Sequence, residues 1–320
     1  MRLGIVVPCY NEEDVLDETV TRLLALLARL VQARKVAEDS AIWLVDDGSR
    51  DRTWPMIARW ADRDSRVAGV KLSRNQGHQN ALLAGLFTAE GDALVSVDAD
   101  LQDDLAAIEH MVDEFRGGSD VVYGVRRTRS SDSAFKRGTA QAFYRLMSIL
   151  GAESIHNHAD FRLMSRRAVE SLKDFREVNL FLRGIVPLIG LPSAIVHYDR
   201  HERFAGESKY PLRRMLSLAW NAITSFSVVP LRAITVLGFV VFVATLVLGF
   251  WVIGVRLFTE SAVPGWASTV LPIYFIGGIQ ILCLGIIGEY LGKIYREVKS
   301  RPRYFIEKRV GRHAPPLPRP

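Results

Sequence analysis

The sequence predicts an α/β domain with a mainly parallel sheet, followed by an amphipathic interfacial helix and two transmembrane helices. In the first two-thirds of the chain, short apolar runs alternate with longer segments whose apolar residues recur at helical spacing. This alternation is typical of layered α/β folds. The last third contains two stretches without a charged residue, 233–255 and 261–288, and each is long enough to cross a bilayer.

The predicted elements follow one another in order along the chain. The apolar run 3–8 predicts the first strand, and residues 12–30 predict a helix because their leucines and valines repeat at helical spacing. The same patterns continue through the next hundred residues or so. Further strands are predicted at 41–45, 67–72, 93–97 and 120–123, and further helices at 53–61, 79–89 and 105–115.

Polar residues follow four of these strands where each one ends. Mainly parallel sheets bind ligands beyond the carboxyl ends of their strands, so these residues mark a candidate site. A second interpretation is that Asp47, Ser49 and Asp51 cap the next helix. The residues at these strand ends are Pro8, Tyr10, Asn11, Glu12 and Glu13 for the first strand, Asp46, Asp47 and Ser49 for the second, Ser73, Arg74, Asn75 and Gly77 for the third, and Asp98, Asp100 and Gln102 for the fourth.

The most informative of these strand ends carries Asp98 and Asp100, with one residue between them. Two carboxylates at the edge of a buried strand repel each other and lose hydration. A hard divalent cation that bridges to a phosphate would offset both costs. On these residues alone, a solvated loop rich in aspartate explains the pattern as well.

Neither of the common phosphate-binding glycine motifs occurs. The first strand is not followed by G-x-G-x-x-G, and the chain contains no G-x-x-x-x-G-K-[ST]. A nucleotide site without these motifs, beside a D-x-D pair, indicates a sugar nucleotide. The net charge of +6 is modest for a nucleic-acid binder, so no nucleic-acid partner is expected, whereas an anionic membrane face suits it.

The compartment is predicted from the two cysteines and the N-terminus. Cys9 lies in an expected core strand and Cys283 in an apolar helix, which disfavours a disulfide and fits a reducing compartment. The first apolar run is too short for a signal peptide. The catalytic domain is therefore expected in the cytoplasm.

Two transmembrane helices are predicted at about 231–256 and 269–291 within a membrane region of 230–292, and a buried helix pair of a soluble protein is the alternative. Basic residues flank the pair on one side, so both termini are expected in the cytoplasm. The predicted layout is a catalytic domain at 1–210, a juxtamembrane helix at 211–229 and a basic tail at 293–320. The flanking basic residues are Arg213, Arg214, Arg232, Lys293, Arg296, Lys299, Arg301 and Arg303.

The segment 211–229 has apolar residues at helical spacing beside Arg213 and Arg214. This pattern predicts an amphipathic helix that lies in the membrane interface. It would hold the catalytic face at the level of the lipid headgroups. A packing helix of the soluble domain is the alternative.

Several motifs of the chain resemble family 2 glycosyltransferases of the GT-A fold. The C-terminal motifs are similar to the polyprenyl-phosphate branch, which includes dolichol-phosphate mannose synthases and bacterial undecaprenyl-phosphate sugar transferases with two C-terminal membrane helices. Asp104-Leu105 departs from the prolines that relatives often have there, and the absence of Q-x-x-R-W disfavours processive polysaccharide synthases. The motifs are Val7–Glu13, Val45–Ser49, Asn75–Gln79, Asp98–Asp103, Asp160–Met164 and Arg203–Leu212.

The resemblance implies roles for individual residues. Asp46 would bind the base, and Pro8, Tyr10 and Glu12 would surround the nucleoside. Asn75, Gly77 and Asp98 would complete the nucleotide-sugar site, and Asp98 and Asp100 would hold Mg²⁺ or Mn²⁺. Asp160, with Arg162, would act at the reacting centre as a base or an orienting group. Gln102, Arg203, Ser208 and Lys209 would bind phosphate and the lipid acceptor.

Simpler interpretations of these residues stay open. Asp160 and Arg162 are also explained as a structural ion pair. Arg203 and Lys209 are also explained as a basic patch that meets lipid headgroups. His156 and His158 precede Asp160 at alternating positions, so a three-ligand metal site is conceivable, although polar loop histidines explain the pattern more simply.

The function expected from the resemblance is inverting transfer of a hexose, glucose or a related sugar, from a UDP-sugar to undecaprenyl phosphate at the cytoplasmic face of the inner membrane. A mannosyltransferase that uses GDP-mannose is one alternative, and an inactive scaffold of the same fold is another. Relatives associate through their membrane helices and tails, which leaves a homo-oligomer open.

Overall fold

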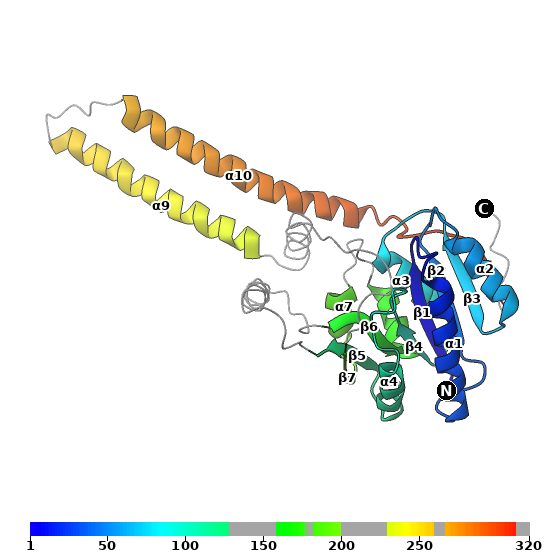
Figure 1. Ribbon diagram of the computed structural model, residues 1–320. Coiled ribbons are helices and arrows are strands. Elements are labelled where there is room, and N and C mark those ends of the chain that lie inside the picture. Colours follow the sequence, from blue (N-terminus) through cyan, green and yellow to red (C-terminus); the bar gives the residue numbers. More distant parts are fainter. Residues whose placement is uncertain (128–157, 176, 178–181, 200–228, 259–265, 312–320) are drawn as a thin grey trace. The chain divides into compact units, whose positions relative to one another are not determined.

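The computed structural model describes residues 1–127, 158–175, 177, 182–199, 229–258 and 266–311 (Figure 1). The chain divides into two compact units. One unit comprises Met1–Thr139, Ser154–Lys209 and Ser300–Pro320. The other comprises Ala140–Glu153 and Tyr210–Lys299. The first unit contains the sheet and the second contains two long helices.

The first unit alternates strands and helices through most of its length. Its strands are β1 (Leu3–Cys9), β2 (Ala41–Asp46), β3 (Val67–Leu72), β4 (Ala93–Ser96), β5 (Val121–Arg126), β6 (His158–Ser165), β7 (Ser193–Tyr198) and β8 (Ile306–Val310). Its helices are α1 (Leu16–Gln32), α2 (Thr53–Arg63), α3 (His78–Thr88), α4 (Ala107–Arg116), α6 (Arg166–Ser171) and α7 (Leu182–Leu188), with a 3₁₀ turn at Leu172–Asp174.

The strands form a single sheet in the order β7-β5-β6-β4-β1-β2-β3-β8. β4, β1, β2 and β3 are parallel neighbours, while β6 and β8 run antiparallel to the strands they pair with. The carboxyl ends of β4, β1, β2 and β3 therefore lie at one edge. The predicted α/β sheet flanked by helices is confirmed, and among the described strands its pairing is mixed, with four parallel and three antiparallel pairs.

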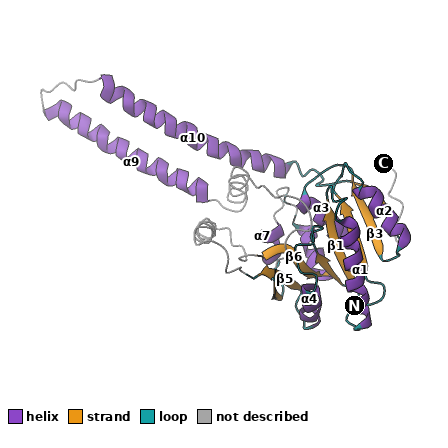
Figure 2. Ribbon diagram, in the orientation of Figure 1, coloured by secondary structure: helices purple, strands orange, loops and turns teal. Residues whose placement is uncertain are grey.

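Helices cover both faces of the sheet (Figure 2). Successive residues of a strand point to opposite faces, so Ile5 joins the core under α1, α2 and α4, and Val6 joins the core under α3, α6 and α7. Both side chains are fully buried. Burial on both faces explains why the parallel strands are continuous apolar runs in the sequence.

The first helix begins four residues later than the sequence analysis predicts. Its apolar positions, such as Leu23 and Leu27, are buried as their spacing predicts. Residues 11–13 instead use their backbone N–H groups in bonds to the loop after β2, and Asn11 has a positive φ of 54°. These loop contacts delay the helix to Leu16.

Three strands lie beyond the region where strands were predicted. β6 contains Asp160 and Arg162, whose charges make it unlike a core strand, although Phe161 and Leu163, which alternate with them, are buried in the core. β7 closes one end of the sheet beside β5. β8 closes the other end with the polar sequence Ile-Glu-Lys-Arg-Val inside the expected basic tail. Charged residues on such a strand protect the sheet edge from pairing with other chains.

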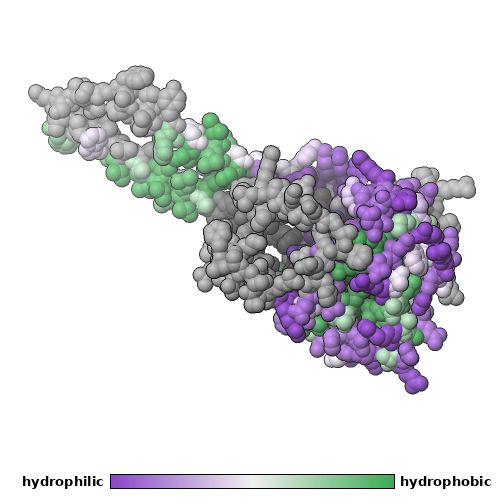
Figure 3. Space-filling view, in the orientation of Figure 1, coloured by the Kyte–Doolittle hydropathy of each residue, from purple (hydrophilic) through white to green (hydrophobic). Residues whose placement is uncertain are grey.

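The second unit contains α9 (Val229–Phe258) and α10 (Trp266–Val298), which lie side by side and include the predicted spans 231–256 and 269–291 (Figure 1). Apolar side chains cover much of their visible surface (Figure 3). Among the described residues, one stretch, Phe275–Val298, is long and apolar enough to cross a membrane. The predicted amphipathic helix at 211–229 falls almost wholly outside the described residues.

The packing of β8 against β3 can be tested at Gly69. A Cβ atom at this position would lie 2.4 Å from Ile57 Cγ2 and 2.7 Å from Val310 Cγ2. Gly69→Ala is expected to destabilise the protein by about 1–3 kcal/mol through overpacking. Because Val310→Ala removes one of the clashing methyl groups, the double variant should lose less than the sum of the two single losses in thermal unfolding. Strict additivity would contradict the packing of β8 on this glycine.

Candidate active site

The loops after β1 and β2 are joined by hydrogen bonds. The backbone N–H of Asn11 donates to Ser49 Oγ at 3.0 Å, and that of Glu12 donates to Thr53 Oγ1 at 2.9 Å. Asp51 accepts bonds from the N–H groups of Glu13 and Thr53, at 3.2 Å and 3.0 Å. The capping interpretation is therefore wrong for Ser49 and holds only in part for Asp51, because these side chains mainly fix the loop that carries Tyr10 and Glu12.

The two aspartates after β2 have different environments. Asp47 accepts the backbone N–H groups of Gln76 and Gly77 at 2.7 and 2.9 Å, so it holds the loop after β3 and does not cap α2. Asp46 is fully buried, and its Oδ1 accepts the N–H of Ser49 at 3.2 Å. Its Oδ2 is buried and has no hydrogen-bond partner in the described structure. Burial raises the pKa of both carboxyl groups.

The loop after β4 carries Asp98 and Asp100, both of them partly exposed. Burial of its carboxyl group and the charges of Asp103, Asp160 and Asp100 raise the pKa of Asp98 to about 6, against an opposing effect of His78. Asp100 Oδ1 accepts the N–H of Gln102, which is itself buried, at 3.2 Å. Burial is the main cause of this shift, and the neighbouring carboxylates add to it.

Asp103 anchors this loop to the far end of the sheet. Its carboxylate is buried, and Oδ1 accepts bonds from Tyr198 on β7 at 2.5 Å and from Arg126 on β5 at 3.2 Å. Burial and the neighbouring carboxylate raise the pKa of Tyr198. The loop of the candidate metal ligands is thus fixed at its C-terminal end by side chains of β5 and β7.

A second charged cluster surrounds Asp160 on β6. Its carboxylate lies 2.5 Å from Arg162 Nη2 and 3.2 Å from Arg183 Nη2, and its Oδ2 lies 3.7 Å from His78 Nε2. The same nitrogen of His78 lies 3.6 Å from Asp98 Oδ1, which connects this cluster to the loop after β4. Although burial acts to raise it, the arginines hold the pKa of Asp160 at about 2. Asp160 is therefore ionised and a weak base.

The structure brings many of the predicted residues to one edge of the sheet. Pro8, Tyr10, Glu12 and Asp46 lie at the ends of β1 and β2, Asn75 and Gly77 follow β3, Asp98, Asp100 and Gln102 follow β4, and Asp160 and Arg162 lie on the neighbouring β6. Arg203, Ser208, Lys209 and His156 lie outside the described residues, as does the side chain of His158.

Sequence reasoning missed two members of the charged cluster. His78 stands within the motif Asn75–Gln79, so the resemblance carried a signal for it. Arg183 belongs to none of the quoted motifs and comes to Asp160 only through the placement of α7. Arg162 is 1% exposed, and this burial favours a positioning role over contact with a substrate.

The carboxylates of the site bear on whether it could hold a divalent cation. Within the described part of the chain, no three His, Cys, Asp or Glu side chains are grouped so that they could hold a metal ion by themselves. Asp98 and Asp100 offer carboxylate oxygens at one loop, and such oxygens suit an ion such as Mg²⁺ or Mn²⁺ that would take its remaining ligands from substrate phosphates and water. The residues therefore fit a cation that binds together with a diphosphate.

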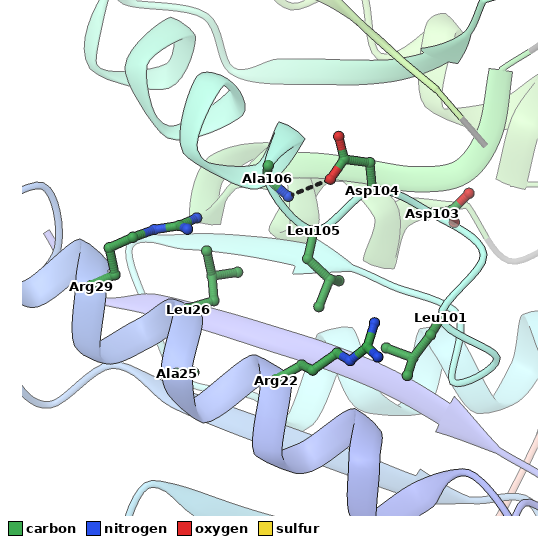
Figure 4. Close-up of a pocket in the computed structure, with 9 residues that line it drawn as sticks. All are labelled: Arg22, Ala25, Leu26, Arg29, Leu101, Asp103, Asp104, Leu105 and Ala106. Carbon is green, nitrogen blue, oxygen red and sulfur yellow. Dashed lines mark hydrogen bonds between the residues drawn. The ribbon is translucent and has the colours of Figure 1, made fainter. Parts of the chain in front are cut away.

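A pocket of about 480 Å³ lies between α1 and the segment 101–106 (Figure 4). Arg22, Leu26 and Arg29 of α1 project into it, opposite Leu101 and Leu105. None of the site residues predicted from the sequence lines this pocket. The pocket shares a loop with Asp98 and Asp100, but it is separate from the predicted site residues at the carboxyl ends of the strands.

A mixed α/β sheet thus carries Asp98 and Asp100 beside the polar ends of its parallel strands. The family model described as Glycosyl transferase family 2 matches residues 4–173. The chain therefore belongs to glycosyl transferase family 2, and it is a glycosyltransferase.

Relatives extend the similarity over nearly the whole chain. Glycosyltransferase YkoT of Bacillus subtilis (strain 168) is 53% identical over 95% of this chain and 91% of its own length. The SfII prophage-derived bactoprenol glucosyl transferase of Shigella flexneri is 39% identical over 96% of this chain and 98% of its own length. The prophage bactoprenol glucosyl transferase homolog of Escherichia coli (strain K12) is 39% identical over 96% and 99%.

Solved structures are more distant. Glucosyl-3-phosphoglycerate synthase from Mycobacterium tuberculosis, in complex with Mn²⁺, UDP and phosphoglyceric acid, is 18% identical with a TM-score of 0.44. The match covers 70% of this chain and 76% of that one.

Gly48 allows a test of the contact between the loops after β2 and β3. It has a φ of +69°, and a Cβ atom would lie 2.6 Å from backbone atoms of Arg74 and Asn75. Gly190 is a matched control, because it has a φ of +70° but no atom within 4 Å of its Cβ position. Both alanine variants should cost about 1–3 kcal/mol in unfolding free energy through backbone strain.

Only Gly48→Ala should also displace the loop after β3, so we expect its KM for the donor to rise about tenfold. Gly190→Ala should keep the KM of the unaltered protein. Steady-state kinetics with varied donor check this difference, and equal KM values for the two variants would show that the close approach at Gly48 does not shape the donor site.

Proposed function

We propose that this protein transfers a hexose, glucose or a related sugar, from a UDP-sugar to undecaprenyl phosphate with inversion at the anomeric carbon. The observation that carries the proposal is the meeting of the loop of Asp98 and Asp100 with the charged cluster of Asp160, within a family 2 glycosyltransferase. Relatives that match over almost their entire length are named bactoprenol glucosyl transferases, which supports a lipid phosphate acceptor and a glucosyl group.

The donor site is proposed at the ends of β1, β2 and β3. Asp46 has a buried carboxylate oxygen without a partner in the described structure, which suits an N–H group of a nucleobase. Uracil presents such a donor at its ring edge. Pro8, Tyr10 and Glu12 on one side and Asn75 and Gly77 on the other would flank the nucleoside.

The diphosphate of the donor is proposed to lie at the end of β4. Asp98 and Asp100 would hold Mg²⁺ or Mn²⁺ there. A bound cation of this kind supplies charge neutralisation for the leaving diphosphate. The carboxylates also order the loop, since Asp100 accepts the N–H of Gln102 and Asp103 anchors the same loop to β5 and β7.

The acceptor needs little help from a base. A lipid monophosphate is already anionic near neutral pH, so it is a competent nucleophile without removal of a proton. The low pKa of Asp160, about 2, supports a role as an orienting group rather than a base. Arg203, Ser208 and Lys209 are proposed to bind the acceptor phosphate.

The location is proposed to be the inner membrane, with α9 and α10 crossing the bilayer and the sheet unit and both termini in the cytoplasm. The uncharged lengths of the two helices and the basic residues that flank them support this topology. The segment 211–229 is proposed to lie in the interface as an amphipathic helix. Residues 306–310 of the expected tail belong to the sheet unit as β8.

The transfer reaction is tested directly with the full-length protein in detergent or membranes. Undecaprenyl phosphate, Mg²⁺ or Mn²⁺ and a panel of labelled nucleotide sugars are supplied, and labelled lipid product is measured. UDP-glucose is expected to give the highest rate. If only GDP-mannose gave product, the donor would be GDP-mannose and not a UDP-sugar. If no donor gave product, the proposed reaction would be refuted.

Asp100→Asn is expected to lower kcat/KM at least about 100-fold, on the order of 2.7 kcal/mol of transition-state stabilisation, because it removes a charged metal ligand. Asp104→Asn is the matched control in the same loop, since among the described residues the Asp104 carboxylate accepts only the N–H of Ala106. Its activity should stay within about twofold. Metal titrations measure both variants, and full activity of Asp100→Asn would move the metal site elsewhere.

Arg203→Ala is expected to raise the KM for undecaprenyl phosphate about tenfold through loss of a charge-assisted hydrogen bond. The KM for the nucleotide sugar should change little. Kinetics with each substrate varied in turn provide the measurement, and unchanged KM values for both would remove Arg203 from the proposed site.

A further inference from the structure

The start of α7 is held from two sides. The backbone N–H of Leu182 donates to Gln79 Oε1 of α3 at 3.0 Å, and its carbonyl accepts a bond from Arg162 Nη1 of β6 at 3.2 Å. Gln79 belongs to the motif Asn75–Gln79, and Arg162 belongs to the motif Asp160–Met164. Because Leu182 is fixed in this way, the position of the next residue, Arg183, is fixed as well.

The guanidinium of Arg183 is oriented by Asp160. Its Nε lies 3.3 Å from Asp160 Oδ1 and its Nη2 lies 3.2 Å from Oδ2, a two-pronged contact. Arg162 holds the same carboxylate from the buried side, with a side chain that is 1% exposed. The side chain of Arg183 is 41% exposed, and its Nη1 has no hydrogen-bond partner among the described residues. Asp160 therefore binds the Nε and Nη2 edge of the guanidinium, and the Nη1 side is available to a ligand.

The charges around Asp160 leave an unbalanced positive group. One carboxylate faces two guanidinium groups, Arg162 and Arg183, and a buried arginine already satisfies it at 2.5 Å. Its Oδ2 also lies 3.7 Å from His78, which lies 3.6 Å from Asp98. The open edge of Arg183 thus belongs to the same cluster as a candidate metal ligand, where phosphate groups would gather.

We propose that Arg183 is a substrate-contacting residue that binds a phosphate group of the transfer reaction, and that Asp160 and Gln79 are its positioning residues. A guanidinium fork suits phosphate oxygens because it offers parallel donors with fixed geometry. The phosphate is either the diphosphate of the donor or the monophosphate of the acceptor, and this choice rests on the proposed function.

The test compares Arg183→Ala and Arg183→Lys in the full-length protein, with KM measured for UDP-glucose and for undecaprenyl phosphate in turn. Arg183→Ala is expected to raise one of the two KM values at least tenfold, and the substrate affected identifies the phosphate. Arg183→Lys should recover part of the loss, because it keeps the charge but not the fork. Gln79→Ala should raise the same KM by a smaller factor.

Arg59→Ala is the matched control. Arg59 is 47% exposed and makes a two-pronged contact with Asp17, at 2.8 and 2.9 Å, between α2 and α1. It should leave both KM values unchanged. If Arg183→Ala also leaves both KM values within twofold and lowers only the melting temperature, Arg183 is a structural ion-pair partner and the proposal is overturned.

Direct binding separates this inference from the proposed reaction. If the unaltered protein forms no lipid-linked product, calorimetry measures binding of UDP with Mn²⁺ and of farnesyl phosphate to the unaltered protein and to Arg183→Ala. At least tenfold weaker binding of one probe to the variant would support Arg183 although the reaction had failed. Equal affinities, or no binding of either probe to the unaltered protein, would overturn the phosphate role.

Discussion

Parallel pairing of β4, β1, β2 and β3 is the constraint on which the rest of the molecule depends. Parallel neighbours end at the same edge, so four loops that are far apart in the sequence emerge side by side. The loops are then tied to one another through side chains that accept backbone N–H groups, as Asp47 does for Gln76 and Gly77. The sheet brings the loops close together, and the side-chain hydrogen bonds fix their positions relative to one another.

The electrostatics of the site follow from crowding acids and bases at that edge. Burial, with a smaller effect of neighbouring carboxylates, raises the pKa of Asp98 to about 6, whereas two arginines hold the pKa of Asp160 at about 2. His78 faces both of them. The cluster thus places carboxylates at one end and guanidinium groups at the other, which is the charge pattern that the proposed metal–diphosphate and acceptor phosphate would require.

Sequence patterns predicted the parts of the fold whose signals are local. The strands 3–8, 41–45 and 67–72 were predicted within one residue of their ends, because strands buried on both faces are continuous apolar runs. β6 was missed because charged residues alternate with its apolar ones, and β8 was missed because an edge strand is polar. The aspartate pair was found from its motif, whereas Arg183 depends on how α7 packs, which no short pattern records.

The position of β8 has a consequence for biosynthesis. The strand that closes the β3 side of the sheet is encoded after α9 and α10, so the ribosome delivers it last. Because domains fold as their residues emerge, β3 stays at an open edge while the two apolar helices are being made. The sheet is completed only when residues 306–310 have left the ribosome. Synthesis thus delivers both apolar helices before the enzyme finishes folding.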